Sequence, residues 1–256
     1  MKNSISLYPL PNFPLVEPGD DLARLIEGAV TSAGLELEVG DCLVVAQKVV
    51  SKSENRYAYL NDVTPQDEAL ALAPQVEKNP RLVQLILDES NEVVRHRPGA
   101  VIVEHRCGYV HANAGIDQSN IANDPDNPRV LLLPLDPDAS AQALRLTLQT
   151  NLDVAHLNIV ISDSAGRAWR NGIVGFALAT AGFAPVADEV GKEDLFGRPL
   201  QVTQIAVADE LAASASLLMG QADNAVPVVL IRGLALAPAD VDSRSLIRAK
   251  AQDLFR

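Results

Sequence analysis

The chain of 256 residues has few aromatic residues, only two cysteines and no long hydrophobic run. Aromatic residues make up 4% of it, so aliphatic side chains must form most of the core. Cys42 and Cys107 are too few for a disulfide framework or a zinc site. No apolar run approaches the roughly 20 residues that span a bilayer, and the N-terminus lacks the hydrophobic region of a secretory signal. We therefore expect a cytoplasmic protein that does not contact the membrane.

The chain also has few basic residues: 21 Lys and Arg against 33 Asp and Glu, which gives a net charge of -12. Nucleic acid is not expected as a partner, because binding its phosphates requires a basic face. Small anions remain possible ligands, since a few cations, amide N–H groups or a divalent metal can build a local positive site. The length allows a single unit over residues 1–256, in one or two lobes.

Helical and strand patterns are mixed without a steady βαβ period. Helices are predicted over residues 18–30, 64–73 with Thr64 as N-cap, 79–90, 136–149 and 208–220. Strands are predicted over residues 42–46, 130–135, 157–163, 201–210 and 226–233, with a hairpin over 99–115 that turns at 106–108. His105 and His111 fall in the hairpin and show no metal-ligand spacing, and a position of His111 near a site is the less favoured alternative. This mixture favours an α+β fold, with mixed sheets and flanking helices, over a doubly wound sheet.

One apolar run ends in Asp163 and Ser164, and Arg167 and Arg170 follow on either side of the only tryptophan. A carboxylate and a hydroxyl at a strand end are hard oxygen ligands, which suit Mg²⁺ or Mn²⁺. The arginines could donate paired hydrogen bonds to phosphate or carboxylate oxygens. The alternative is a plain ion pair between Asp163 and one arginine, and the local pattern alone favours it.

Three further stretches place polar groups at the ends of predicted elements. "NAGIDQSN" contains Asp117 and Asn120 and reads as a ligand-binding turn or as an Asx-type turn. "VVAQKVVSK" places Lys48 and Lys52 in a polar turn after a buried strand, where lysines cradle phosphate or stay solvated. "LLMGQADNAVP" offers Gln221 after a helix that ends in glycine. No phosphate-loop, dinucleotide-binding or nucleophile-elbow motif is present.

Taken in order, the motifs resemble the coenzyme F420-0:L-glutamate ligase family, the F420 γ-glutamyl ligases. The resemblance runs from about Leu7 to Gly233 and includes "FPLVEPGDDL", "DCLVVAQKVVSK", "ANAGIDQSN", "ISDSAGRAWRNGIVGFALATAG" and "LLMGQA". It implies an enzyme that uses GTP to join L-glutamate to the carboxylate of F420-0, a deazaflavin, and then adds further γ-linked glutamates. It also implies an α+β fold in an intertwined homodimer with an active-site cleft. A fused C-terminal reductase-like domain is not expected, because the chain ends soon after Gly233.

The resemblance also implies the site residues. Asp117 and Asp163 would hold one divalent ion, Mg²⁺ or Mn²⁺. Ser164 would bind a second ion with Gln221 or Asp223, and K⁺ would assist. The residues expected to contact GTP are Phe13, Pro14, Leu15, Val16, Gln47, Lys48, Lys52, Asn120, Met219, Gly220, Gln221 and Ala222.

Arg167 and Arg170 complete the expected catalytic set, as contacts to phosphate or to a substrate carboxylate. Alternatively, Arg170 would brace Asp163. Because a carboxylate is a poor acyl donor, the resemblance implies that GTP first converts it to an acyl phosphate. Two other interpretations stay open: a ligase of the same family with a different small carboxylate acceptor, and a non-catalytic protein that binds a nucleotide or a deazaflavin.

Overall fold

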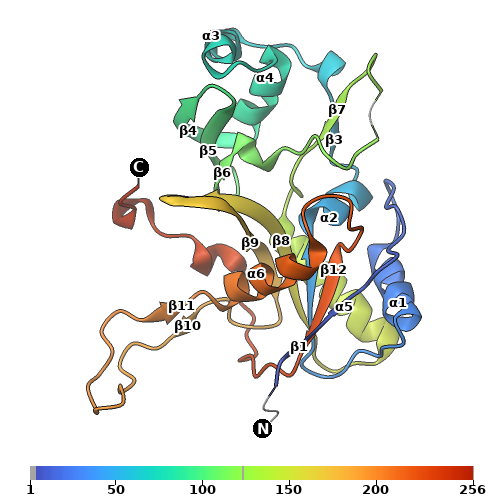
Figure 1. The fold of residues 1–256 in the computed structure, drawn as a ribbon, viewed down its shortest axis with the longest axis vertical. Helices are drawn as coiled ribbons and strands as arrows, with labels where there is room; N and C mark the ends of the chain where they lie inside the picture. Colours follow the sequence, from blue (N-terminus) through green and yellow to red (C-terminus); the bar gives the residue numbers. More distant parts are fainter. Residues whose placement is uncertain (1–3, 123, 256) are drawn as a thin grey trace.

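A computed structural model describes residues 4–122 and 124–255, which form two lobes with separate hydrophobic cores (Figure 1). The strands are β1 (Ser6–Pro9), β2 (Cys42–Ala46), β3 (Tyr57–Tyr59), β4 (Ser90–Arg97), β5 (Ala100–His105), β6 (Val110–Ala112), β7 (Arg129–Leu131), β8 (Asn158–Arg167), β9 (Arg170–Ala181), β10 (Ala187–Asp188), β11 (Gln204–Ile205) and β12 (Val228–Arg232). The α-helices are α1 (Leu22–Ser32), α2 (Gln47–Ser53), α3 (Asp67–Val76), α4 (Pro80–Asp88), α5 (Pro137–Leu152) and α6 (Val207–Met219).

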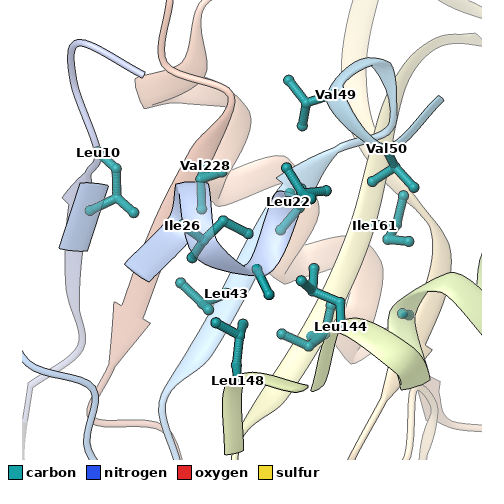
Figure 2. Packing of buried hydrophobic residues seen from close by; sticks show 14 of the residues in the cluster. Leu10, Leu22, Ile26, Leu43, Val49, Val50, Leu144, Leu148, Ile161 and Val228 are labelled. Atoms are coloured by element: carbon teal, nitrogen blue, oxygen red, sulfur yellow. The ribbon is translucent and has the colours of Figure 1, made fainter. Parts of the chain in front are cut away.

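The main lobe is built on a five-stranded sheet in the order β1-β12-β2-β8-β9. Only the β2–β8 pair in this sheet is parallel, and the other neighbours are antiparallel. Side chains alternate between the faces, so Leu43 of β2 joins the core under α1 and α5, whereas Val44 joins the core under α6. Figure 2 shows Ile26 and Leu148 beside Leu43, which confirms that aliphatic side chains form this core.

The second lobe packs α3 and α4 against the three-stranded sheet β4-β5-β6. Leu82 and Ile86 on one face of α4 meet Val101 and Val103 of β5 in its core. A ribbon formed by β3 and β7 runs beside this lobe (Figure 1). Within the described residues no helix is long and apolar enough to cross a membrane.

The α+β prediction is confirmed, and four of the predicted helices, α1, α4, α5 and α6, are present close to their expected bounds. Asp21, Asn79 and Asp136 cap the first three of these helices through their side chains. The helix expected from Thr64 begins instead at Asp67, with Gln66 as N-cap. The backbone N–H of Gln66 donates to Oε1 of Gln84 in α4 (2.7 Å), which holds the chain extended up to that point.

The strand predictions are less accurate at element ends. The polar turn predicted at Gln47 and Lys48 is the first turn of α2. The strand expected over 201–210 is reduced to β11, because α6 already begins at Val207. The strand expected over 130–135 ends at Leu131, where β7 leaves its partner β3.

The largest difference is the hairpin formed by β8 and β9. The expected strand end at Asp163 is wrong, because β8 continues to Arg167 and pairs with β9 along its length. The sequence pattern did not indicate β9, which contains glycines and alanines of low strand propensity. Packing explains one of these glycines, because a Cβ on Gly175 would overlap the backbone carbonyl of Ala212 in α6. Gly175 therefore allows α6 to lie directly on β9.

Candidate active site

The site begins where β2 passes into α2. Gln47, the first residue of α2, is 1% exposed, and its Oε1 accepts a hydrogen bond from Oγ of Ser51 (2.9 Å). This contact orients the side-chain amide so that its Nε2 donates to Oδ2 of Asp117 (2.6 Å). Lys48 and Lys52 are four residues apart in the helix, so they share one face.

Asp117 follows a 3₁₀ turn over Asn113–Gly115 and lies against α2. Its Oδ1 is 3.1 Å from Nζ of Lys48, and its side chain is 23% exposed. Burial raises the pKa of Asp117; the Lys48 ammonium opposes this shift, and the nearby Asp163 carboxylate adds to it. The two expected metal ligands, which are 46 positions apart in the sequence, therefore lie close enough to repel each other.

Asp163 lies within β8 and contacts a histidine of the second lobe. Nε2 of His111 in β6 is 3.3 Å from Oδ2 of Asp163, and the backbone N–H of Ser164 donates to Oδ1 of Asp163 (2.7 Å). Nδ1 of His111 lies 2.9 Å from the carbonyl oxygen of Ala112. Both neighbours of the ring are oxygen atoms, and the contact of Nε2 with Asp163 has an ion-pair distance without hydrogen-bond geometry. Asp163 and Ser164 are adjacent strand residues, so their side chains point to opposite faces of the sheet.

The environment of His111 agrees with this geometry. Burial lowers the pKa of His111, but the close contact with the Asp163 carboxylate and its charge outweigh burial, so the pKa is raised overall. The ring also lies against Phe176 of β9, with ring centroids 5.4 Å apart. The sequence placed His111 in a hairpin, with a position near a site as the less favoured alternative. Its burial within an alternating strand was the available signal, and the partner, Asp163, is brought in by tertiary packing.

The segments expected to bind the nucleotide come together around α2. Nζ of Lys52 donates to the carbonyl oxygen of Asn120 (2.8 Å), and Nδ2 of Asn120 donates to the carbonyl oxygen of Ala222 (3.0 Å). The backbone N–H of Gly19 donates to the carbonyl oxygen of Ser53 at the end of α2 (2.9 Å). These bonds connect the expected loop after α6, the Asn120 segment and the N-terminal segment to one helix.

Two of these segments have a defined shape. Phe13 and Val16 are buried in the main core and anchor the N-terminal segment, whereas Leu15 between them is 85% exposed. Gly220 after α6 has a positive φ of 68°, and a Cβ there would overlap the side chain of Asn224. The N-terminal segment is thus anchored by two buried side chains, and the glycine allows the loop after α6 to pass close to Asn224.

Lys48, Lys52 and Arg129 form a cluster of cations near Asp117. Burial lowers the pKa of Lys52, and the neighbouring Lys48 and Arg129 cations lower it further. The guanidinium of Arg129 lies 4.1 Å from the ring centroid of Tyr57. A cavity of about 460 Å³ lies next to Arg129 of this cluster. It is lined by Tyr59, Ala122, Asp124, Asn127 and Arg129.

The two predicted arginines lie apart from the two carboxylates. Arg167 and Arg170 face each other at the tip of the β8–β9 hairpin, and both are exposed. Arg167 is four residues from Asp163, about 13 Å along an extended strand. The alternative ion pair between Asp163 and one arginine is not formed, because Asp163 pairs with His111 instead. Gln221 is exposed in the loop after α6.

The donor set fits a divalent cation with few protein ligands. Among the described residues, no group of three or more histidine, cysteine, aspartate or glutamate side chains is arranged to hold a metal ion. The two carboxylates remain as hard oxygen donors, whereas the Ser164 hydroxyl points to the other face of the sheet. Mg²⁺ is commonly held by one or two carboxylates together with phosphate oxygens and water, so this small set is sufficient when a phosphate ligand is present.

Comparison with known proteins identifies the family. Residues 12–233 match the family described as F420-0:Gamma-glutamyl ligase. A protein from Methanothermobacter thermautotrophicus named coenzyme F420:L-glutamate ligase is 44% identical over 254 residues, covering 98% of this chain and 99% of the relative. Proteins of the same name from Methanopyrus kandleri and Archaeoglobus fulgidus are 40% and 38% identical, each covering at least 96% of both chains. The chain therefore belongs to the F420-0:gamma-glutamyl ligase family.

Proposed function

We propose that the protein is a GTP-dependent ligase that adds L-glutamate to coenzyme F420-0 and then adds further γ-linked glutamates. Membership of the family and the names of its relatives support this substrate class. The observation that carries the proposal is the Asp117 carboxylate, which lies 3.1 Å from Nζ of Lys48 and interacts electrostatically with Asp163 of a third segment. Carboxylates and ammonium groups at one point suit the handling of a metal-bound phosphate.

The reaction proceeds through an acyl phosphate. A carboxylate oxygen of F420-0 attacks the γ-phosphorus of GTP, and GDP leaves. The amino group of glutamate loses a proton and attacks the acyl carbon, which forms the amide and releases phosphate. Lys48 and Lys52 on one face of α2 bind phosphate oxygens, and the loop Met219–Ala222 and the backbone of residues 13–16 enclose the nucleotide.

Asp117 and Asp163 would hold Mg²⁺ or Mn²⁺, and Ser164 would hold a second ion with Gln221 or Asp223. When bound, the ions supply positive charge to the γ-phosphate, and K⁺ assists. His111 and Gln47 keep the two carboxylates oriented through the contacts described above. The mutual repulsion of the carboxylates supports this role, because a cation between them relieves it.

The reaction product tests the proposal directly. Purified protein is incubated with F420-0, GTP, L-glutamate and Mn²⁺, and the product masses are measured over time. We expect a ladder of species heavier by one or more glutamyl residues. When the F420-0 carboxylate carries ¹⁸O, the released phosphate gains ¹⁸O, because the acyl phosphate intermediate transfers one carboxylate oxygen to it. ATP in place of GTP measures the nucleotide preference.

Controls separate the alternatives. The Asp163→Asn protein should remain folded and lose turnover, and the Methanothermobacter relative serves as the positive control. No mass shift with F420-0, but a shift with another small carboxylate, assigns the protein to a different acceptor within the same family. No phosphate release with any acceptor points to a non-catalytic binding protein. Unlabelled phosphate from labelled F420-0 contradicts the acyl phosphate step.

A further inference from the structure

The C-terminal segment lies beyond residue 233, where the match to the family model ends, whereas the Methanothermobacter relative aligns over 98% of this chain. Residues 243–255, here called the strap, run from the main lobe toward the second lobe and end beside the β8–β9 hairpin (Figure 1). The strap is attached at several points, and each attachment belongs to a different part of the fold.

The first attachment is to the main lobe. Ser243 is 2% exposed, and its backbone N–H and Oγ donate to the two carboxylate oxygens of Asp138 in α5 (3.1 Å and 2.9 Å). Its Oγ also lies within hydrogen-bond distance of the carbonyl oxygen of Leu178 in β9 (2.9 Å). The start of the strap is therefore held by a buried polar contact between a helix and the sheet.

The second attachment lies at the joint between the lobes. Ile247 packs against a small cluster that contains Tyr109, Leu133 and Leu178, with Phe176 at its edge. A Cβ on Gly108 would lie 2.9 Å from Cδ1 of Ile247, so the strap also lies directly on the turn between β5 and β6. The hydroxyl of Tyr109 donates to the carbonyl oxygen of Leu178, which connects the second lobe to β9 beneath Ile247.

The third attachment is to the second lobe. Nζ of Lys250 lies 2.8 Å from Oε2 of Glu92 in β4 and 3.8 Å from Oε2 of Glu104 in β5. Beyond it, the ring of Phe255 lies 6.4 Å from that of Trp169 at the hairpin tip. The strap thus contacts α5, β9, the β4–β5 sheet and the hairpin within a few residues.

A chain of contacts connects the cluster around Ile247 to Asp163. Phe176, at the edge of the Ile247 cluster, contacts His111, and His111 contacts Asp163. Tyr109 and His111 are two residues apart in one extended segment, so their side chains share a face. A shift of β6 relative to β9 at Tyr109 would therefore move His111 relative to Asp163.

We propose that the strap closes the joint between the lobes and that Ile247 is a positioning residue, which holds His111 in contact with Asp163. The catalytic consequence rests on the proposed ligase function, whereas the closing of the joint does not. Removing Ile247 contacts loosens the segment over residues 109–112 without touching a substrate-binding group.

The structural test compares Ile247→Ala with Leu254→Ala. Both changes shorten an aliphatic side chain of the strap to alanine, but Leu254 is 88% exposed and lies outside the Ile247 cluster. Hydrogen exchange of the amides over residues 109–112 is expected to quicken at least about threefold in Ile247→Ala and to stay unchanged in Leu254→Ala. Fluorescence of Trp169, the only tryptophan, reports whether the end of the strap remains docked.

A charge exchange provides an independent variant that does not alter the apolar cluster. Lys250→Glu is expected to quicken exchange over 109–112, and Lys250→Glu with Glu92→Lys is expected to restore protection. Arg248→Glu is the matched control, since it makes the same charge change at an exposed position of the strap. Unchanged exchange in both Ile247→Ala and Lys250→Glu overturns the proposed closure.

The functional test measures glutamate transfer in the same variants. Ile247→Ala is expected to lower kcat about tenfold with little change in KM for GTP, because the contact positions Asp163 and not the nucleotide. Faster exchange with an unchanged kcat overturns the positioning role. An inactive wild-type protein contradicts the proposed function instead, and the exchange comparison still decides whether the strap closes the joint.

Discussion

At the scale of single residues, Asp117 is a charged group in an unfavourable position. It is largely buried, Lys48 and the Gln47 amide offset part of the cost of its charge, and Asp163 increases that cost. Such an arrangement is typical of functional sites, where stability is lost so that charge is available for binding. Removing the charge should therefore have opposite effects on stability and on activity.

We predict that Asp117→Asn stabilises the metal-free protein at neutral pH and lowers ligase activity at least about a hundredfold. The folded-state pKa of Asp117 is raised, so its neutral form favours the folded state, and this contribution is lost as the pH rises through the raised pKa. The asparagine variant mimics the neutral form at every pH. Urea midpoints in EDTA should therefore differ most near pH 8, and the difference should shrink toward pH 5.

Asp126→Asn is the control, because it makes the same change at an exposed position in the loop that follows. Its urea midpoint and activity should match those of the wild type at both pH values. A midpoint for Asp117→Asn that falls below the wild type at pH 8 would contradict the proposed cost of the buried charge.

At the scale of elements, the sequence predicted the helices whose apolar periodicity and caps are local features of the chain. Apolar periodicity and caps located α1, α4, α5 and α6, and the resemblance named Asp117 and Asp163, which come together. The local patterns did not locate β9, because its glycines and alanines are explained by tertiary packing and not by strand propensity. For the same reason Asp163 was assigned to a strand end, although the strand continues because β9 pairs with it.

We predict that Gly175→Ala destabilises the fold by about 1–3 kcal/mol, because the added Cβ overlaps the carbonyl of Ala212 and pushes α6 from β9. Gly166→Ala on the partner strand β8 is the control, since a Cβ there meets no atom within 4 Å. Its effect should stay within about 0.5 kcal/mol of the wild type. Equal urea midpoints for the two variants would show that α6 does not contact β9 as described.

At the scale of the whole molecule, an arm formed by β10, β11 and the loop between them projects from the main lobe (Figure 1). Leu195, Phe196 and Val202 on this arm are 100%, 82% and 85% exposed. Large apolar side chains gathered on a projecting arm are typical of a surface that another chain covers. The resemblance predicts an intertwined homodimer, so we expect the arm to pack on a second copy of this chain.

The prediction is that Leu195→Ser with Phe196→Ser weakens self-association of the 27.3 kDa chain about a hundredfold or more. Burying one such side chain contributes about 1.5–3 kcal/mol, and two of them account for this factor. Sedimentation velocity over a range of concentrations measures the dissociation constant, with Leu254→Ser, an exposed leucine on the strap, as control. A dimer that is equally tight in both variants would place the interface elsewhere, and a wild-type monomer at all concentrations would contradict the homodimer itself.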